Sequence, residues 1–446
     1  MASLDIPRLE DYGVFPSTGF LPSELPLERL PQDYYEPWEV LVNNLPALIL
    51  TKTIRAKIDA LPQLSTEKLE DERQWRRAYQ VLSFLAHAYV WTGHQPSQHL
   101  PKQIADPWVA TSEKLGLPPV ATYAGLCLWN FKQIVPNPDN LWDLDNLTTI
   151  NTYTGSIDES WFYLVSVYFE YKGAYSIRAG LEAIKQADRG NVKGVVAALQ
   201  ALAESIDHLG SVLMRMEENC DPHVFYYRMR PYLAGWRNMA EVGLDKGGVF
   251  YGDEVKPRAY AGGSNAQSSL IQFLDVLLGI KHYSTGERPL PHASEPPKAE
   301  ASDNAFMDEM KDYMPGNHRE FLFHLQRITN IRSFVLSQDN GELTLAYDAC
   351  LAMMKAFRDK HIRIVTRYIV LQAKKAPKLG STSTHRSGLA KQKKEERGTG
   401  GTSLLPFLKQ CRDETGDPAA GSWGQRILSD GVMRLSLSTP NPINED

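Results

Sequence analysis

A histidine lies in the middle of a long apolar stripe near the C-terminal end of the chain. The members of this stripe recur in steps of three and four residues, the spacing of one helix face: Tyr347, Cys350, Met354, Phe357, His361, Ile364 and Tyr368. A histidine in such a stripe must satisfy two ring nitrogens away from water. It can bind a metal through one nitrogen, or it can be a core histidine with two hydrogen-bond partners. The spacing is compatible with both interpretations of His361.

If His361 is a metal ligand, haem suits it better than zinc. The sequence has no HExxH motif and no paired Cys/His cluster of the kind that binds zinc. Haem supplies four ligands of its own and needs a single axial histidine. Arg358 lies one helical turn earlier, where a guanidinium can neutralise a haem propionate. A solvated ion pair is the alternative for Arg358.

Two glycine-containing segments could approach a ligand closely. Residues 261–269 (AGGSNAQSS) lead directly into an apolar segment, and residues 398–402 (GTGGT) follow a basic stretch. Glycine permits close backbone approach, and a helix N-terminus attracts an anion. The first segment is neither a Walker loop nor GxGxxG, because no strand precedes it and no lysine closes it. A serine-capped loop and a flexible linker are the respective alternatives.

Aromatic and hydroxyl side chains form two further candidates. Residues 225–231 (FYYRMRP) combine rings with arginines, which could stack on an aromatic amino acid and bind its carboxylate. Aromatic helix packing beside a surface arginine is the alternative. Ser166 interrupts the apolar run at residues 162–167 (FYLVSV), where it either bonds its own backbone carbonyl or faces a ligand.

Composition limits the class of protein. The chain has 446 residues, of which 43% are hydrophobic and 23% charged, with a formal net charge of -5. This balance disfavours a nucleic-acid-binding protein. No apolar run approaches the roughly 18 residues that span a membrane, and the N-terminus does not resemble a signal peptide. Four scattered cysteines without a CxxC pair predict no disulfide framework. We therefore expect a cytoplasmic protein that binds neither membrane nor nucleic acid.

The elements that must position these residues are predicted to be helices. Apolar or amphipathic helical segments are expected at residues 80–90, 122–131, 161–171, 193–217, 269–280 and 343–372. A further helix is expected to begin at Asn317 as N-cap, with Glu320 as its capping partner. Since no strand pattern is convincing, the predicted fold class is all-α.

Three regions are expected along the chain. Residues 1–155 form a small N-terminal helical domain with an irregular, proline-rich arm, and a polar stretch after VPNP (135–138) ends it. Residues 156–410 form a larger helical domain that carries the candidate site. Within it, residues 373–402 have the composition of a mobile loop. Residues 411–446 form a C-terminal extension with little periodicity, which we expect to be partly disordered.

Together, these segments resemble the indoleamine 2,3-dioxygenases, monomeric haem enzymes that convert tryptophan to N-formylkynurenine. The matching stretches follow the family order over roughly residues 10 to 410. They are residues 88–91 (AYVW), 117–119 (LPP), 162–166 (FYLVS), 232–236 (YLAGW), 261–264 with 267–269, 273–280 (FLDVLLGI), 314–315, 318–319 and 321–322, His361 with 364–366, and 398–402.

The resemblance implies a fold and a set of roles. The fold is a small N-terminal helical domain that caps a larger helical domain holding haem b. The residues that would contact or support the haem are His361 as proximal ligand of the iron, Arg358 near a propionate, Gly263, Ser264, Asn265, and Asp275 in the proximal network. The residues that would contact the substrate or close over it are Tyr123, Leu126, Phe162, Ser166, Phe225, Arg230 on the carboxylate, Ser264 and Thr402.

The implied reaction is cleavage of the indole C2–C3 bond of L-tryptophan with O2, which is the first step of the kynurenine pathway. The resemblance also implies a monomer that receives electrons from an external reductant. Ser166 is then an orienting residue and not an essential base. Departures from the family pattern put substrate affinity in doubt, because Asn265 replaces a small alanine, Tyr163 and Tyr226 replace phenylalanines, and Cys127 replaces an aliphatic residue. The alternatives are a haem enzyme acting on another indole, a non-catalytic haem-binding sensor, and a purely structural helical scaffold.

Overall fold

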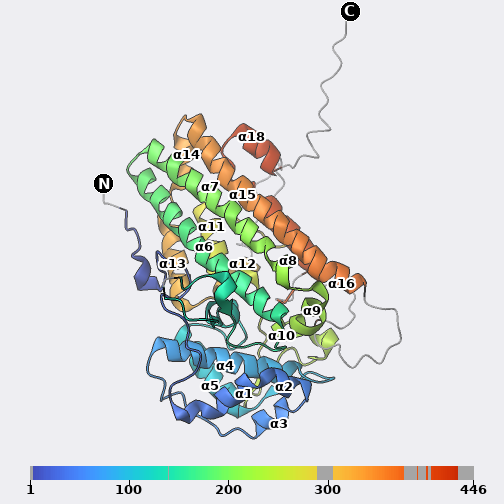
Figure 1. Cartoon of the computed structure of the whole chain (residues 1–446). Helices are drawn as coiled ribbons and strands as arrows, with labels where there is room; N and C mark the ends of the chain where they lie inside the picture. The colour runs from blue at the N-terminus through green and yellow to red at the C-terminus, as the bar shows by residue number, and fades with distance from the viewer. Residues whose placement is uncertain are drawn as a thin grey trace, which may run out of the picture.

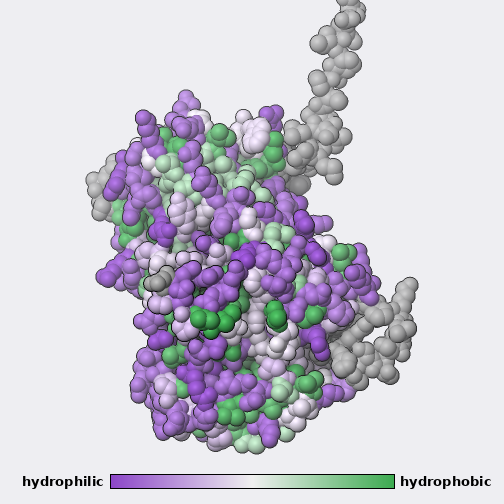
Figure 2. Space-filling view, in the orientation of Figure 1, coloured by the Kyte–Doolittle hydropathy of each residue, from purple (hydrophilic) through white to green (hydrophobic). Residues whose placement is uncertain are grey.

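The computed structural model describes residues 4–138, 140–288, 305–375, 389, 398–399 and 403–429, and this part of the chain is almost wholly helical. The only strands among these residues are two-residue segments, β1 (His99–Leu100) parallel to β4 (Phe250–Tyr251) and β2 (Lys132–Gln133) antiparallel to β3 (Leu147–Thr148). The predicted all-α fold class is therefore confirmed. No helix among the described residues is both long and apolar enough to cross a membrane. Figure 2 shows that hydrophilic residues cover most of one face, with hydrophobic residues in small groups.

Shorter helices build the N-terminal part, at the bottom of Figure 1. They are α1 (Glu36–Asn43), α2 (Leu45–Leu50), α3 (Ile54–Asp59), α4 (Glu72–Trp91) and α5 (Lys102–Leu115), with the 3-10 turns η2 (Asp33–Tyr35) and η4 (Leu144–Asn146) and the π-helical turn η3 (Ala124–Leu128). The first 3-10 turn, η1 (Leu9–Tyr12), instead packs against α13 (Gly316–Ile328). Asp71 caps α4 by accepting a hydrogen bond from the backbone N–H of Gln74. The helix is buried along most of its length and forms the centre of this part.

Three long helices, α6 (Ile157–Asp188), α7 (Val192–Met214) and α15 (Gly341–Val365), lie side by side in the upper part of Figure 1. Each begins at a side-chain cap, provided by Ser156, Asn191 and Asn340. The remaining helical elements are α8 (Met216–Asn219), α9 (Pro222–Val224), η5 (Phe225–Met229), α10 (Arg230–Leu233), η6 (Ala240–Val242), η7 (Asn265–Gln267), α11 (Ser269–Leu277), α12 (Ala305–Lys311), α13 (Gly316–Ile328), α14 (Ile331–Ser337), η8 (Thr366–Val370), α16 (Leu371–Lys374), α17 (Leu404–Glu414), α18 (Ser422–Gly424) and η10 (Gln425–Ser429).

Two glycines of α6 let α11 pack against it. A Cβ atom at Gly173 would lie 2.0 Å from Leu270 Cδ2, and one at Gly180 would lie 2.5 Å from Leu277 Cδ2. Both distances are shorter than a Cβ contact tolerates, so a larger residue at either position would force the facing leucine side chain to shift. This packing places the N-terminal end of α11, and the segment 261–269 before it, against the middle of α6.

The structure corrects one prediction about where an element begins. Helix α13 begins at Gly316 with Pro315 as N-cap and no side-chain cap, whereas Asn317 accepts from the adjacent His318 N–H. The predicted capping box at Asn317 is wrong because Pro315 already adopts the extended conformation that precedes the helix. Helix α6 begins directly after residue 155, where the domain boundary was expected. The division into two domains stays a prediction.

The C-terminal segment also differs from expectation. The expected start of an extension at residue 411 falls inside α17, and residues 411–429 are folded against α15. The Asp348 carboxylate anchors this segment by accepting from the backbone N–H groups of Ala420 (2.8 Å) and Gly421 (3.0 Å). Residues 411–429 therefore contain helical segments that pack on the rest of the chain, while the expected partial disorder of residues 411–446 stays a prediction. Residues 430–446, and most of the expected loop at residues 373–402, lie outside the described residues.

A buried ion pair joins α1 to α4 in the N-terminal part. Arg77 donates to Glu39 at 3.0 and 2.5 Å and to Asn151 at 2.6 Å, and the Arg77 and Glu39 side chains are each 1% exposed. Removing one charge leaves the other buried without a partner, which costs about 3–5 kcal/mol. We expect Glu39→Gln to lower the free energy of unfolding by this amount in urea titrations.

The matched control is Glu24→Gln, because Glu24 pairs with Arg73 on the exposed surface. Exposed pairs contribute roughly 0–1 kcal/mol. Equal losses in the two variants would contradict the importance of the buried pair.

Candidate functional site

A largely apolar cavity lies where η3, α6, η5, α15 and α17 meet. About 1140 Å³ of its space is free of protein atoms, the open solvent at its mouth included. Among the residues predicted from sequence, those that line it are Tyr123, Leu126, Phe162, Phe225, Arg230, Gly263, Ser264, Asn265 and His361. Cys127 and Tyr163, which depart from the family pattern, line it too. The structure therefore brings most of the predicted site residues to one cavity.

His361 lies on α15 and presents its ring to this cavity. Burial, together with the nearby Arg358 charge, lowers the pKa of His361 to about 4, so the imidazole is neutral at physiological pH. No hydrogen bond joins the ring to another residue in the described part of the chain. A neutral imidazole with an available lone pair is the form that binds a metal.

His87 shows what a satisfied core histidine looks like in the same protein. Its Nε2 accepts from the Ala121 N–H at 2.8 Å, and its Nδ1 lies 2.8 Å from the Tyr232 carbonyl oxygen. Burial lowers the pKa of His87 to about 3, so this ring is also neutral. Since both nitrogens of His87 are occupied within the described chain, it has none to offer a ligand. His361 differs from it in this respect.

The aromatic segment at residues 225–231 forms one side of the cavity. Phe225 lies in the π-helical turn η5, 5.0 Å from the Phe162 ring centroid and 5.7 Å from that of Tyr368. Arg230 is fully buried, its guanidinium lies 5.3 Å from the Tyr226 ring centroid, and its Nη1 donates to the Leu389 carbonyl at 3.3 Å. The alternative interpretation, in which this arginine lies on the surface, is therefore wrong for Arg230. The arrangement places a cation beside aromatic rings inside an apolar cavity.

The two predicted glycine segments meet at another side of the cavity. The Gly262 N–H donates to the Thr399 carbonyl at 3.1 Å, and the Thr399 hydroxyl donates to the Gly263 carbonyl at 2.6 Å. A Cβ at Gly262 would lie 2.2 Å from the Leu233 carbonyl oxygen, and one at Gly263 would lie 2.6 Å from Leu126 Cδ1. Larger residues would therefore displace the backbone or fill the cavity edge. Thr402 lies outside the described residues.

Ser166 is half-buried beside the cavity and is not among the residues that line it. Its hydroxyl donates to the Phe162 carbonyl at 3.5 Å, the backbone contact considered from sequence. Burial raises the pKa values of Tyr123 and Cys127, and the same hydroxyl lies close enough to both residues to oppose this rise. Ser166 therefore contacts two lining residues, through which it can affect the cavity.

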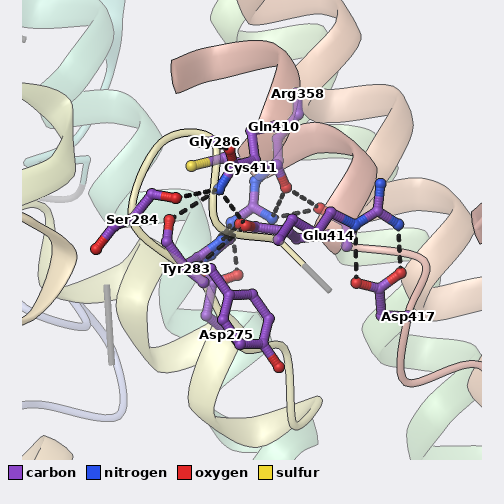
Figure 3. Close-up of polar contacts among 12 residues, drawn as sticks. Asp275, Tyr283, Ser284, Gly286, Arg358, Gln410, Cys411, Glu414 and Asp417 are labelled. Carbon is purple, nitrogen blue, oxygen red and sulfur yellow. Dashed lines mark hydrogen bonds and ion pairs between the residues drawn. The ribbon is translucent and has the colours of Figure 1, made fainter. Parts of the chain in front are cut away.

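Arg358 and Asp275 also lie outside the cavity lining. The Arg358 Nη2 donates to both Asp275 oxygens at 2.6 and 2.7 Å, and both residues are buried. Figure 3 shows the two side chains pointing toward each other from α15 and α11. The solvated ion pair considered as the alternative for Arg358 is therefore wrong, because this pair is buried. The predicted contact of Arg358 with a propionate stays a prediction.

Sequence reasoning missed the part of the cavity that α17 provides. Leu404, Phe407 and Leu408 line it from this helix, and Phe306 packs edge-on against Phe407 with ring centroids 5.1 Å apart. The spacing of three and four residues among the α17 positions is itself a helical signal.

Comparison with known proteins agrees with this geometry. The indoleamine 2,3-dioxygenase family model matches residues 8–418. The chain is 46% identical over 433 residues to indoleamine 2,3-dioxygenase from Saccharomyces cerevisiae, covering 92% of this chain and 93% of the relative. It is 38% identical to 6-hydroxytryptophan 2,3-dioxygenase from Fusarium equiseti (91% and 96% covered) and 36% identical to indoleamine 2,3-dioxygenase 1 from Mus musculus (93% and 96% covered).

These similarities extend over nearly the whole chain and identify an oxidoreductase of the dioxygenase class. The chain belongs to the indoleamine 2,3-dioxygenase family. The resemblance inferred from sequence is confirmed, and the purely structural scaffold is excluded as an interpretation.

A buried carboxyl group behind the cavity yields a testable pH dependence. Glu170 Oε1 accepts from Tyr123 at 3.1 Å and from Ser268 at 2.5 Å, while Oε2 has no hydrogen-bond partner among the described residues. Burial raises the pKa of Glu170 to about 7. Because the folded state binds this proton more tightly than the unfolded state, the Glu170 contribution favours folding at low pH and is lost as pH rises through about 7.

We therefore expect Glu170→Gln to become more stable relative to the unmodified chain between pH 5 and pH 8, by on the order of 3 kcal/mol in total. Urea titrations at several pH values measure this difference. A difference that does not vary with pH would contradict the raised pKa.

Proposed function

We propose that this chain binds haem b through His361 and uses O2 to cleave the indole C2–C3 bond of L-tryptophan, forming N-formylkynurenine in the first step of the kynurenine pathway. The observation that carries this proposal is the neutral His361 imidazole, which faces a largely apolar cavity and has no hydrogen bond within the described chain. Membership of the indoleamine 2,3-dioxygenase family supports the reaction type.

The residues around the cavity fit a haem. A haem needs one axial protein ligand, and His361 is a single imidazole among apolar neighbours such as Ile364 and Phe407. The glycine segment at residues 262–263 leaves the space that a side chain there would fill. When bound, haem supplies the redox chemistry with O2 that no amino-acid side chain provides.

The protein's own residues bind and orient the substrate in this proposal. Phe162 and Phe225 contact the indole, together with Tyr123 and Leu126, and exclude water from it. Arg230 binds the substrate carboxylate, because its buried guanidinium lies at the cavity among these rings. Ser166 orients Tyr123 and Cys127 through the hydroxyl that lies close to both. It is not an essential base, since positioning is the main contribution that the reaction needs.

A second candidate function is cleavage of a different indole. Cys127 and Asn265 add polar atoms to the cavity lining, and a relative is named for its action on 6-hydroxytryptophan. Tyr163 contributes less to this difference, because its hydroxyl donates to Glu159 at 3.0 Å. The expectations of a monomer, an external reductant, a cytoplasmic location and no nucleic-acid or membrane partner stay predictions.

One experiment separates these candidates. The haem-loaded protein is reduced without oxygen, O2 and L-tryptophan are added, and N-formylkynurenine is measured. Product formation supports the proposal, and turnover that is faster with a hydroxylated indole in direct competition favours the second candidate. A haem spectrum without product from either substrate would contradict both candidate reactions.

We expect His361→Ala to lose haem, because no other histidine is among the described residues that line the cavity. The measurement is the ratio of haem absorbance to protein after gel filtration of protein loaded with excess haem. His208→Ala is the matched control, because His208 is exposed on α7. Stoichiometric haem in His361→Ala would exclude His361 as the iron ligand.

We expect Arg230→Lys to raise KM for L-tryptophan by on the order of ten-fold or more, because lysine keeps the charge but loses the planar fork that binds a carboxylate. Steady-state kinetics should show a smaller change in kcat. Arg228→Lys is the control, because Arg228 is exposed two residues earlier. If both variants keep the original KM, Arg230 does not bind the carboxylate.

A further inference from the structure

Four ionisable side chains from different elements meet behind the cavity. Asp275 comes from α11, His282 from the segment after it, Arg358 from α15 and Glu414 from α17. His282 Nδ1 lies 2.6 Å from Glu414 Oε2, and its Nε2 lies 3.1 Å from Asp275 Oδ2. Figure 3 shows the labelled members of this cluster converging from the three helices.

All four side chains are buried, and Glu414 is 0% exposed. Burial lowers the pKa of His282, and Arg358 at 3.2 Å lowers it further, but the Asp275 charge and the hydrogen bonds outweigh both, so the pKa lies well above its usual value. His282 is therefore an imidazolium at neutral pH. The negative charges of two carboxylates then balance the positive charges of His282 and Arg358. A buried ionic cluster is tolerated when its charges balance in this way.

The cluster leaves little room for a metal ion. His282, Cys411 and Glu414 lie close enough together to suggest one. However, both ring nitrogens of His282 already contact carboxylates, and Glu414 Oε1 accepts from the Tyr283 N–H at 3.0 Å and from Gln410 at 2.7 Å. The charged Arg358 also lies within the group and opposes a second cation.

The cluster is connected to the cavity through two helices. Arg358 precedes His361 by one turn on α15, and its Nη1 donates to the Cys411 carbonyl at 3.0 Å and to the Thr415 hydroxyl. Helix α17 carries Cys411 and Glu414 toward this cluster and Phe407 toward the cavity. A displacement of α17 or of Arg358 therefore changes both the surroundings of His361 and the cavity lining opposite.

We propose that His282 and Glu414 are positioning residues for the site: their ion pair holds α17 and Arg358 against α11 and thereby sets the orientation of His361 toward the bound haem. This inference rests on the proposed function for the identity of the bound group. The residues involved act through Arg358 and α17, and neither His282 nor Glu414 lines the cavity.

The experiment uses the full chain with His282→Gln, Glu414→Gln and the double variant. Asp417→Asn is the matched control, because Asp417 pairs with Arg288 outside the cluster, three residues beyond Glu414. In the haem-free chain, the urea midpoint of the double variant should equal that of the more damaging single variant, since the two residues act as a pair. If the shift in urea midpoint of the double variant equals the sum of the two single shifts, His282 and Glu414 do not act as a pair.

The haem-loaded chains test the positioning role. We expect either single variant to release ferric haem to excess apomyoglobin on the order of 10- to 100-fold faster, the usual effect of removing a residue that supports a metal ligand. Resonance Raman spectra of the ferrous forms should show a shifted iron–histidine stretch, which a purely structural defect elsewhere would not produce. The variants could show non-additive urea midpoints and yet keep the original rate of haem release and the original iron–histidine stretching frequency. That result would overturn the positioning role and leave the proposed function intact.

Two further outcomes are decisive. An original chain that takes up no haem overturns the proposed function, and the positioning role with it. The purified chain could also contain one equivalent of zinc that the Cys411→Ser variant lacks. This result would show that the cluster binds a metal ion and would overturn the ion pair between His282 and Glu414. If Glu414→Gln does not fold, Gln410→Ala replaces it, because this change keeps both charges and removes the amide hydrogen bond to Glu414, together with those to the Tyr283 and Ser284 carbonyls and from the Gly286 N–H. It should accelerate haem release to a smaller extent. Unchanged release in Gln410→Ala would then count against the proposal.

Discussion

The structure of the site depends on keeping an imidazole neutral and available inside an apolar cavity, one helical turn from a buried arginine. His361 meets this condition because burial and the Arg358 charge both disfavour its protonation. An unpaired Arg358 at this depth would cost several kcal/mol. Asp275 neutralises it through two hydrogen bonds, so these two side chains link α11 to α15. Gly173 and Gly180 of α6 allow this position of α11.

Helix α17 completes the same arrangement from the C-terminal side. Its Leu404, Phe407 and Leu408 lie at the cavity, and its Cys411 and Glu414 are buried in the ionic cluster. A helix with two such contacts links the shape of the cavity to the charges behind it. The 11 residues of α17 could not be stable on their own, so these tertiary contacts are what stabilise the helix.

The N-terminal part reaches the cavity through polar contacts with backbone groups. His87 bridges the Ala121 N–H and the Tyr232 carbonyl, and Trp91 donates to the Ala234 carbonyl at 2.9 Å. These bonds hold η3 and the residues after α10 against α4. The segments that provide Tyr123, Leu126 and Arg230 are therefore oriented by a helix that contributes no side chain to the cavity lining.

The sequence by itself determined the helical class, the stripe that carries His361 and, through the family resemblance, most residues at the cavity. Helical periodicity is local and survives in a single sequence, as the stripe from Tyr347 to Tyr368 shows. The role of a buried histidine is not local, since His87 and His361 differ only in partners supplied by distant segments. The folding of residues 411–429 and the pairing of His282 with Glu414 likewise depend on contacts between segments far apart in the chain. Only the tertiary structure decided them, because spacing along one segment cannot specify which partner another segment brings to it.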